Sequence, residues 1–322
     1  MANLSPDESW LLKDWAKEWL RLSVHLKPRS RSTYESVLRN WILPHLGEVA
    51  LRSITPLAVR RWVATMQGEG AGTERVRYAH RVLAQVLGAA VDCDLIERTP
   101  CRGVRLPRSQ KREMAFLSPA ELEGLVEATL PHYRMLVALL GYTGLRWGEA
   151  TALRRRCIDL DEGRIRVQES LAEVNGHLYF GETKTHTARE IVAAPFLIKR
   201  LREHLVTVDR SEDALVFTTQ TGMPVRNCNF HRHVWRPALA KAGLPETLRI
   251  HDLRHTCASM LIASGVNIKA IQRQLGHATA TMTLDRYGHL SASTLDEVGA
   301  SLESIHIAAS ERRGWSPQSE VR

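Results

Sequence analysis

Six side chains in the carboxy-terminal two thirds of this 322-residue chain are of types that could act together on one negatively charged substrate. They lie in the segments TGLRWGE (143–149), ETKTHTARE (182–190), HDLRHT (251–256) and LGH (275–277), and in a tyrosine that follows ten residues later. These residues are Arg146, Lys184, His251, Arg254, His277 and Tyr287. The set combines two guanidinium groups, an ammonium group and two imidazoles with one phenol that could serve as a nucleophile.

The chemistry that suits this set is attack on a phosphodiester. Two guanidinium groups can grip the non-bridging oxygens and stabilise the pentavalent transition state, which is the role we expect for Arg146 and Arg254. A tyrosine hydroxyl has a pKa of about 10, so Tyr287 needs a base or strongly positive surroundings. A phosphotyrosine bond conserves the energy of the broken bond, so religation needs neither ATP nor a metal. The sequence also lacks a GxxxxGK[ST] loop and a paired-carboxylate metal cluster, and we expect no cofactor and no metal.

The remaining side chains suit proton transfer and support. His251 is the expected proton acceptor and Lys184 the expected donor to the leaving oxygen of the phosphodiester, although the two roles could be exchanged. His277 would bind the phosphate or share the proton transfer. Glu149 is expected to orient an Arg or His side chain, and His255 to cap or pack.

Each segment taken alone also has an ordinary structural interpretation. Arg146 and Glu149, three residues apart, could form a surface pair on a helix. His251 and His255 have the spacing of zinc ligands, but no HExxH motif and no third ligand accompany them. Tyr287 alone would more often be a core or surface aromatic residue than a nucleophile.

Taken together, the order, spacing and types of these residues resemble the tyrosine recombinase (phage integrase) family, over about residues 8–300. Members carry an Arg in G-L-R-x-x-E, a Lys on a hairpin turn, an H-x-x-R pair, an L-G-H segment and a late Tyr, in this order. The resemblance implies a site-specific DNA recombinase (integrase) that works through a 3′-phosphotyrosyl intermediate. Its role would be integration or excision of a phage or other mobile element.

The resemblance also implies partners. We expect double-stranded DNA with paired core recombination sites, a homotetramer on DNA, a monomer when free, and an accessory directionality or DNA-bending protein. Many phage integrases have a further small amino-terminal domain for arm-type sites. Here the first helix leaves no room for one, which indicates either a simpler recombinase or a truncated gene product.

Two other functions fit parts of the pattern. Residues 255–263 and 267–275 flank Gly265 like a helix-turn-helix, which would suit a non-catalytic DNA-binding regulator, but a regulator would not need Lys184 and Tyr287. A type IB-like topoisomerase uses similar residues. A separate basic helical module in residues 1–97 and a helix predicted in residues 291–322 favour recombination over relaxation of supercoils.

The elements that must position these residues predict a mainly α fold with a small antiparallel β-sheet, in two domains. Residues 1–97 read as a helical core-site DNA-binding domain. Its helices are expected to begin at the capping box at Ser5, near 30–33 and at Thr55-Pro56, and to include 73–90. Residues 98–113, with two prolines and six Arg or Lys, are expected to be a basic linker.

Residues 114–290 read as a mixed α+β catalytic domain of the tyrosine recombinase type. It opens with a capping box at Ser118, and helical periodicity returns at 196–205 and dominates from 229. Asn175-Gly176 predicts a hairpin. The expected strands are 164–168, 171–174, 177–180 and 190–194. In residues 291–322 a helix with an apolar stripe could pack on its own domain, but we favour docking on a neighbouring protomer. The stripe comprises Leu295, Val298, Leu302 and Ile305.

The net charge of +9 is concentrated in the first third of the chain, where residues 1–113 hold 19 Lys and Arg against 12 Asp and Glu. This asymmetry favours a module that grips DNA. The DNA-contact candidates are Arg75, Arg77, His80, Arg81, Arg102, Arg105, Arg108, Lys111 and Arg112. With no apolar run long enough for a membrane span, no secretory leader and five cysteines without a CxxC pair, we expect a cytoplasmic, nucleoid-associated protein.

Overall fold

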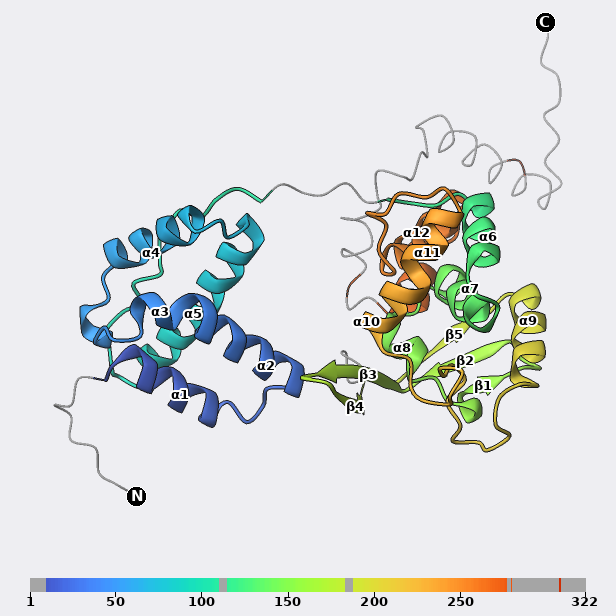
Figure 1. The fold of residues 1–322 in the computed structure, drawn as a ribbon, viewed down its shortest axis with the longest axis horizontal. Coiled ribbons are helices and arrows are strands. Elements are labelled where there is room, and N and C mark those ends of the chain that lie inside the picture. Colours follow the sequence, from blue (N-terminus) through green and yellow to red (C-terminus); the bar gives the residue numbers. More distant parts are fainter. Residues whose placement is uncertain (1–9, 110–114, 183–187, 277–278, 280–306, 308–322) are drawn as a thin grey trace, which may run out of the picture. The chain divides into compact units, whose positions relative to one another are not determined.

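The computed structural model describes residues 10–109, 115–182, 188–276, 279 and 307. The chain divides into two compact units, which are considered separately below (Figure 1). The first unit comprises residues 1–113 with 172–179, and the second comprises 114–171 with 180–322. The predicted fold class is confirmed, because helices dominate and the strands form only small sheets. No helix within the described ranges is long and apolar enough to cross a membrane.

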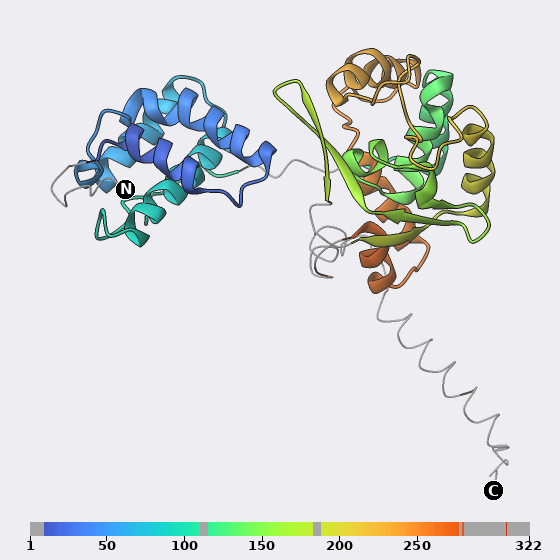
Figure 2. The same cartoon turned by 90° about the horizontal axis from the view of Figure 1, so that it is seen from below.

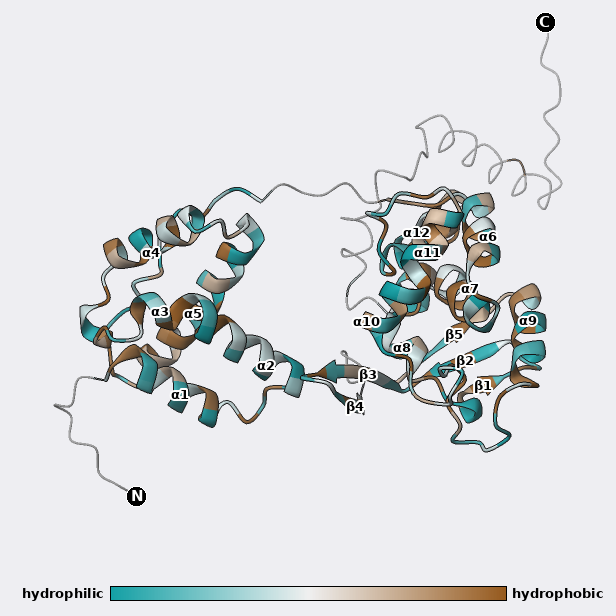
Figure 3. Cartoon of the chain, viewed as in Figure 1, coloured by the Kyte–Doolittle hydropathy of each residue, from teal (hydrophilic) through white to brown (hydrophobic). Residues whose placement is uncertain are grey.

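The helical part of the first unit packs around α5. Its elements are α1 (Leu12–Leu22), α2 (Pro28–Val37), a π-turn (Leu38–Ile42), α3 (Leu43–Leu46), a 3-10 turn (Leu51–Ser53), α4 (Pro56–Gly68) and α5 (Thr73–Asp92). The predicted start at Thr55 is confirmed, since its hydroxyl accepts a hydrogen bond from the backbone N–H of Ala58 at 3.2 Å. Figure 3 colours the apolar residues of α5 brown. Val76 and Leu83 of this helix are fully buried. Ser5 lies outside the described residues.

α2 begins earlier than the predicted range of 30–33. Pro28 occupies its first turn, where the missing N–H of proline costs nothing because that group has no partner within the helix.

The second unit holds eight α-helices among its described residues. They are α6 (Pro119–Ala128), α7 (Arg134–Thr143), α8 (Trp147–Thr151), α9 (Pro195–Leu205), α10 (Asn227–Phe230), α11 (Arg236–Lys241), α12 (Asp252–Ala263) and α13 (Ile268–Leu275). Short 3-10 turns lie at Pro131–Tyr133 and Arg155–Cys157, and a π-turn lies at His231–Trp235. The capping box at Ser118 is confirmed, because Ser118 and Glu121 each accept a hydrogen bond from the backbone N–H of the other.

The strands form two small sheets rather than the one predicted. They are β1 (Ile158–Asp159), β2 (Arg164–Val167), β3 (Glu169–Val174), β4 (His177–Glu182) and β5 (Arg189–Val192). β1, β2 and β5 form an antiparallel sheet, while β3 pairs with β4 (Figure 2). Only Gln168 separates β2 from β3, so one run of strand residues leaves one sheet and enters the other. Asn175 and Gly176 turn the β3–β4 hairpin with positive φ values of 50° and 79°, as their pair predicts.

The core of the second unit is built around α7, whose residues 135–141 are all buried. α7 contacts α12, and α13 contacts β5. These contacts bring the end of α7, where TGLRWGE begins, next to the helix of HDLRHT, and the helix that ends in LGH next to the strand that follows ETKTHTA.

Two helical stretches continue through a proline by widening into a π-turn. The residue before Pro44, Leu43, donates its backbone N–H to Leu38 five residues earlier. Arg236, the residue before Pro237, donates in the same way to His231. Proline cannot donate and clashes with the carbonyl four residues before it, and the wider turn relieves this clash.

Candidate active site

The first segment begins where α7 ends at Gly144, which has a left-handed φ of 68°. A Cβ atom at this position would lie 2.4 Å from Cδ2 of Leu275, so only glycine fits here. The chain then enters α8, for which Arg146 is the N-cap residue. The carboxylate of Glu149 accepts a hydrogen bond from the backbone N–H of Arg146 at 2.9 Å, which fixes the start of the helix.

The side chain of Arg146 is held from two directions. Its Nη1 donates to Glu149 at 2.7 Å, and its Nη2 donates to the backbone carbonyl of Gly276 at 3.0 Å. A guanidinium group has five N–H donors, so these bonds orient the group and use two of them among the described residues. The expectation that Glu149 orients an arginine agrees with this geometry.

Glu149 is also bound by a second arginine, Arg189, at the start of β5. Arg189 donates from Nη1 and Nη2 to the two carboxylate oxygens at 2.9 and 2.7 Å. The side chains of Arg189 and Glu149 are only 12% and 1% exposed. Burial raises the pKa of Glu149, but hydrogen bonding and charge from Arg189, and then from Arg146, outweigh it and lower the pKa to about 2. Glu149 is therefore a carboxylate at any physiological pH.

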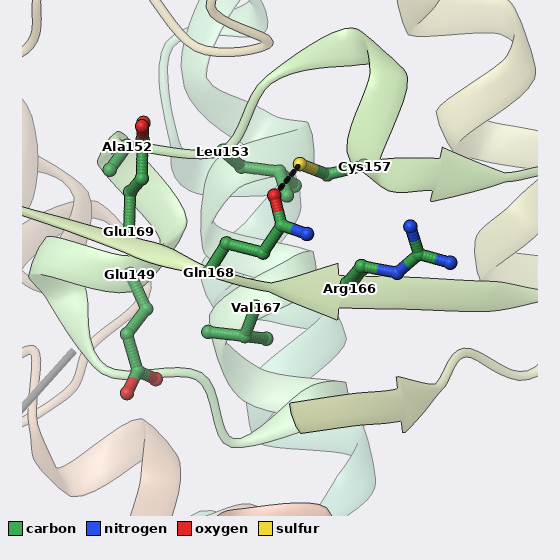
Figure 4. Close-up of a pocket in the computed structure, with 8 residues that line it drawn as sticks. All are labelled: Glu149, Ala152, Leu153, Cys157, Arg166, Val167, Gln168 and Glu169. Atoms are coloured by element: carbon green, nitrogen blue, oxygen red, sulfur yellow. Dashed lines mark hydrogen bonds between the residues drawn. The ribbon is translucent and has the colours of Figure 1, made fainter. Parts of the chain in front are cut away.

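The same glutamate lines a small pocket of about 10 Å³ (Figure 4). Its carboxylate is directed away from Cys157 and Gln168, which also line this pocket. The pocket has room for no more than one water molecule. The charge of Glu149 thus serves its two arginines and no ligand in this pocket.

Helix α12 carries the H-x-x-R pair. The Arg254 side chain is buried, and its Nη1 donates to the backbone carbonyl of Gly144 at 2.6 Å. His251 is exposed at the N-cap position of α12. His255 is buried, and its ring packs against that of His251 with centroids 5.1 Å apart and planes at 85°. Packing is one of the two roles expected for His255.

The L-G-H segment begins at the end of α13. Leu275 is fully buried, and Gly276 ends the helix with a left-handed φ of 67°. A Cβ atom on Gly276 would lie 2.5 Å from Nε of Arg189, so the backbone approaches the arginine closely. The leucine and glycine of this segment thus have packing roles.

Hydrogen bonds join Arg254 to Gly144, two residues before Arg146, and join Arg146 to Gly276, while His251 lies at the start of the helix that carries Arg254. Lys184, His277 and Tyr287 lie outside the described residues. Sequence reasoning missed Arg189. The available signal was an arginine at the start of a predicted strand, five residues after Lys184, but its partner Glu149 is 40 residues away.

The DNA-contact candidates of the first unit differ in their surroundings. Arg75 and Arg81 are exposed, with their guanidinium groups 5.1 Å from the Trp41 ring and 5.9 Å from the Tyr78 ring. Arg102, Arg105 and Arg108 are exposed, while Lys111 and Arg112 lie outside the described residues.

Two other candidates hold the expected linker on the first unit. Arg77 donates to the carbonyl of Pro107 at 3.0 Å. His80 is half-buried, which lowers its pKa, although a backbone hydrogen bond with Cys101 opposes this. Cys101 itself is buried in the core of the unit. Residues 101–107 therefore pack on α5, and Arg77 and His80 are engaged within the unit.

The chain is similar to known proteins over most of its length. The sequence matches the model of the phage integrase family over residues 115–294 and that of the phage integrase N-terminal SAM-like domain over residues 11–67. The integrase of Mycobacterium phage D29 is 31% identical over 301 residues, covering 91% of this chain and 78% of the relative. A tyrosine recombinase XerC-like protein of Caldanaerobacter subterraneus subsp. tengcongensis is 27% identical over 310 residues, covering 87% and 78%.

A solved structure has the same fold. The Tn1549 transposon integrase, in complex with a circular intermediate DNA, matches with a TM-score of 0.80 at 22% identity, covering 92% of this chain and 100% of that one. The family model alone spans more than half of the chain, and the phage relative aligns over most of its length. The chain therefore belongs to the phage integrase family and is a tyrosine-type site-specific recombinase that serves the integration of mobile elements.

Proposed function

We propose that this recombinase cuts and rejoins DNA through a 3′-phosphotyrosyl bond to Tyr287. The phenol oxygen attacks the scissile phosphorus, the bond from phosphorus to the 5′ oxygen breaks, and the phenol proton passes to His251. Lys184 donates a proton to the leaving 5′ oxygen, and His277 binds the phosphate. A 5′ hydroxyl from another strand then reverses these steps, so that no bond energy is lost and no cofactor is needed.

Arg146 and Arg254 bind the non-bridging oxygens of the phosphate. Their guanidinium groups are held in place before substrate arrives, so little reorganisation is needed when negative charge builds up in the transition state. Lysine cannot replace them, because it lacks the planar fork that binds two oxygens at once.

The observation that carries this proposal is that hydrogen bonds of Arg146, Arg189 and Arg254 join the four segments that the sequence singles out. Arg254 holds the carbonyl of Gly144, Arg146 holds the carbonyl of Gly276, and Arg189 holds Glu149. Sequence positions 130 and 110 residues apart are joined directly in this way. Such a network suits one reaction centre rather than four separate structural sites.

DNA with paired core sites is the proposed substrate, as the DNA in the Tn1549 integrase complex supports. Exchange involves two duplexes, each bound by two protomers, so we propose a homotetramer on DNA and a monomer in free solution. The first unit would grip the core site with exposed arginines such as Arg75 and Arg81.

The test uses a core-site DNA with a nick that traps the covalent intermediate. Tyr287→Phe should bind the site but form no adduct that survives denaturant, because only the hydroxyl is lost. Tyr179→Phe is the control, since Tyr179 is an exposed tyrosine of β4 outside the proposed centre. An adduct of normal yield in the Tyr287→Phe variant would remove Tyr287 as the nucleophile.

Arg254→Ala tests the phosphate clamp in the same assay. It should reduce cleavage far more than DNA binding, because the guanidinium acts mainly on the transition state. Recombination at the wild-type rate by this variant would show that the clamp is wrongly assigned.

A further inference from the structure

Arg189 makes no proposed contact with DNA, yet it lies at the junction of the segments that form the site. Among the described residues, Glu149 forms ion pairs with two arginines, Arg146 and Arg189. The side chain of Arg189 binds the two carboxylate oxygens of Glu149 and lies close to the backbone at Gly276. Its position therefore bears on Arg146, which binds both Glu149 and Gly276.

The charges at this junction decide what Arg146 can do. Glu149 carries one negative charge and is almost completely buried, so water screens it little. Paired with Arg146 alone, it would cancel the positive charge that a phosphate needs. The bidentate contact with Arg189 supplies a second positive charge, and the three groups together keep a net charge of +1.

We propose that Arg189 is a positioning residue that neutralises Glu149, so that Glu149 can orient Arg146 without cancelling its charge toward the scissile phosphate. This inference rests on the proposed function, because it requires Arg146 to bind the phosphate. The close approach of Gly276 adds a steric part, since it leaves the Arg189 side chain little freedom to turn away from Glu149.

The test compares Arg189→Gln with the double variant Arg189→Gln/Glu149→Gln, using the nicked core-site DNA. The single variant leaves a buried carboxylate with Arg146 alone, and cleavage should fall by about tenfold or more while site binding is unchanged. The double variant removes the carboxylate as well, so it should cleave faster than the single variant. A role in packing alone predicts the opposite, because the double variant loses more contacts.

Arg164→Gln is the matched control. Arg164 forms an ion pair with Glu190 at 3.0 Å on the same sheet, but both side chains are about half exposed. Cleavage by this variant should equal that of the wild type. Arg189→Lys is a second variant, which keeps the positive charge without the planar guanidinium and should retain more cleavage than Arg189→Gln. It keeps the test decisive if Arg189→Gln lowers the melting temperature of the protein.

The outcomes separate this inference from the proposed function. If Arg146→Ala abolishes cleavage while Arg189→Gln and Arg189→Lys cleave normally, the inference is overturned and the phosphate clamp stands. A double variant that is no faster than Arg189→Gln also overturns it. Normal cleavage by Arg146→Ala would overturn both.

Discussion

Replacing Gly144 with alanine should destabilise the second unit more than the same change at Gly243. Both glycines have a φ of 68°, a conformation that costs an L residue about 1–2 kcal/mol. At Gly144 the new Cβ would also lie 2.4 Å from Leu275 and 3.3 Å from Cys257, whereas at Gly243 it would meet nothing within 4 Å. Overpacking adds about 1–3 kcal/mol, so we expect losses of about 2–5 and about 1–2 kcal/mol respectively.

Urea unfolding of the full chain measures this difference, because both glycines lie in the same unit and report on the same transition. The two variants should also differ in activity. The carbonyl of Gly144 holds Arg254, so Gly144→Ala should lose cleavage more than DNA binding, while Gly243→Ala should keep both. Equal losses of stability, or equal cleavage by the two variants, would refute the reasoning.

Three further predictions concern proton transfer, assembly and pH. Lys184→Ala should be rescued by a substrate with sulfur in place of the bridging 5′ oxygen, since a thiolate leaves without a proton; equal impairment on both substrates would move the role to His251. Deleting residues 291–322 should preserve single-site cleavage but impair the four-protomer complex in sedimentation, because each Leu or Ile of the tail would contribute about 1.5–3 kcal/mol if a neighbouring protomer buried it; normal assembly would place the tail on its own domain. Glu149 should contribute stability that is complete above pH about 4.5 and lost as the pH falls toward about 2, because its pKa is lowered in the folded state. Urea unfolding at several pH values should show that the free energy of unfolding falls less steeply with acid in Glu149→Gln than in the wild type. The same dependence on pH in both proteins would contradict the lowered pKa of Glu149.

Local signals in the sequence predicted much of the fold. The capping box at Ser118, the helix start at Thr55 and the Asn175-Gly176 hairpin each depend on residues within a few positions of one another, and all three are confirmed. The order of the chemical segments also predicts that Arg146 and Arg254 share a site, and this stays a prediction.

Contacts between distant residues could not be predicted in this way. Nothing near Arg189 in the sequence indicates that its partner is Glu149, which lies 40 residues earlier in α8. Arg77 and His80 resemble a solvated basic face, but the packing of residues 101–107 on α5 engages both. Charge and spacing therefore do not predict the direction in which each side chain points.

The two π-turns beside prolines have a consequence for insertions and deletions. An extra residue in a regular α-helix rotates everything after it by about 100°, since each turn holds 3.6 residues. In the stretch from Asn227 to Lys241, the wide turn at 231–235 absorbs one residue, so that Phe230 before it and Leu239 after it both face the core. Losing one residue within that turn would leave the two halves in phase but would restore the clash of Pro237 with the preceding turn, whereas losing one between that turn and Leu239 would turn Leu239 toward water. These turns are therefore the places where the helices can lose one residue without changing which side chains face the core, at the cost of a proline inside a regular helix.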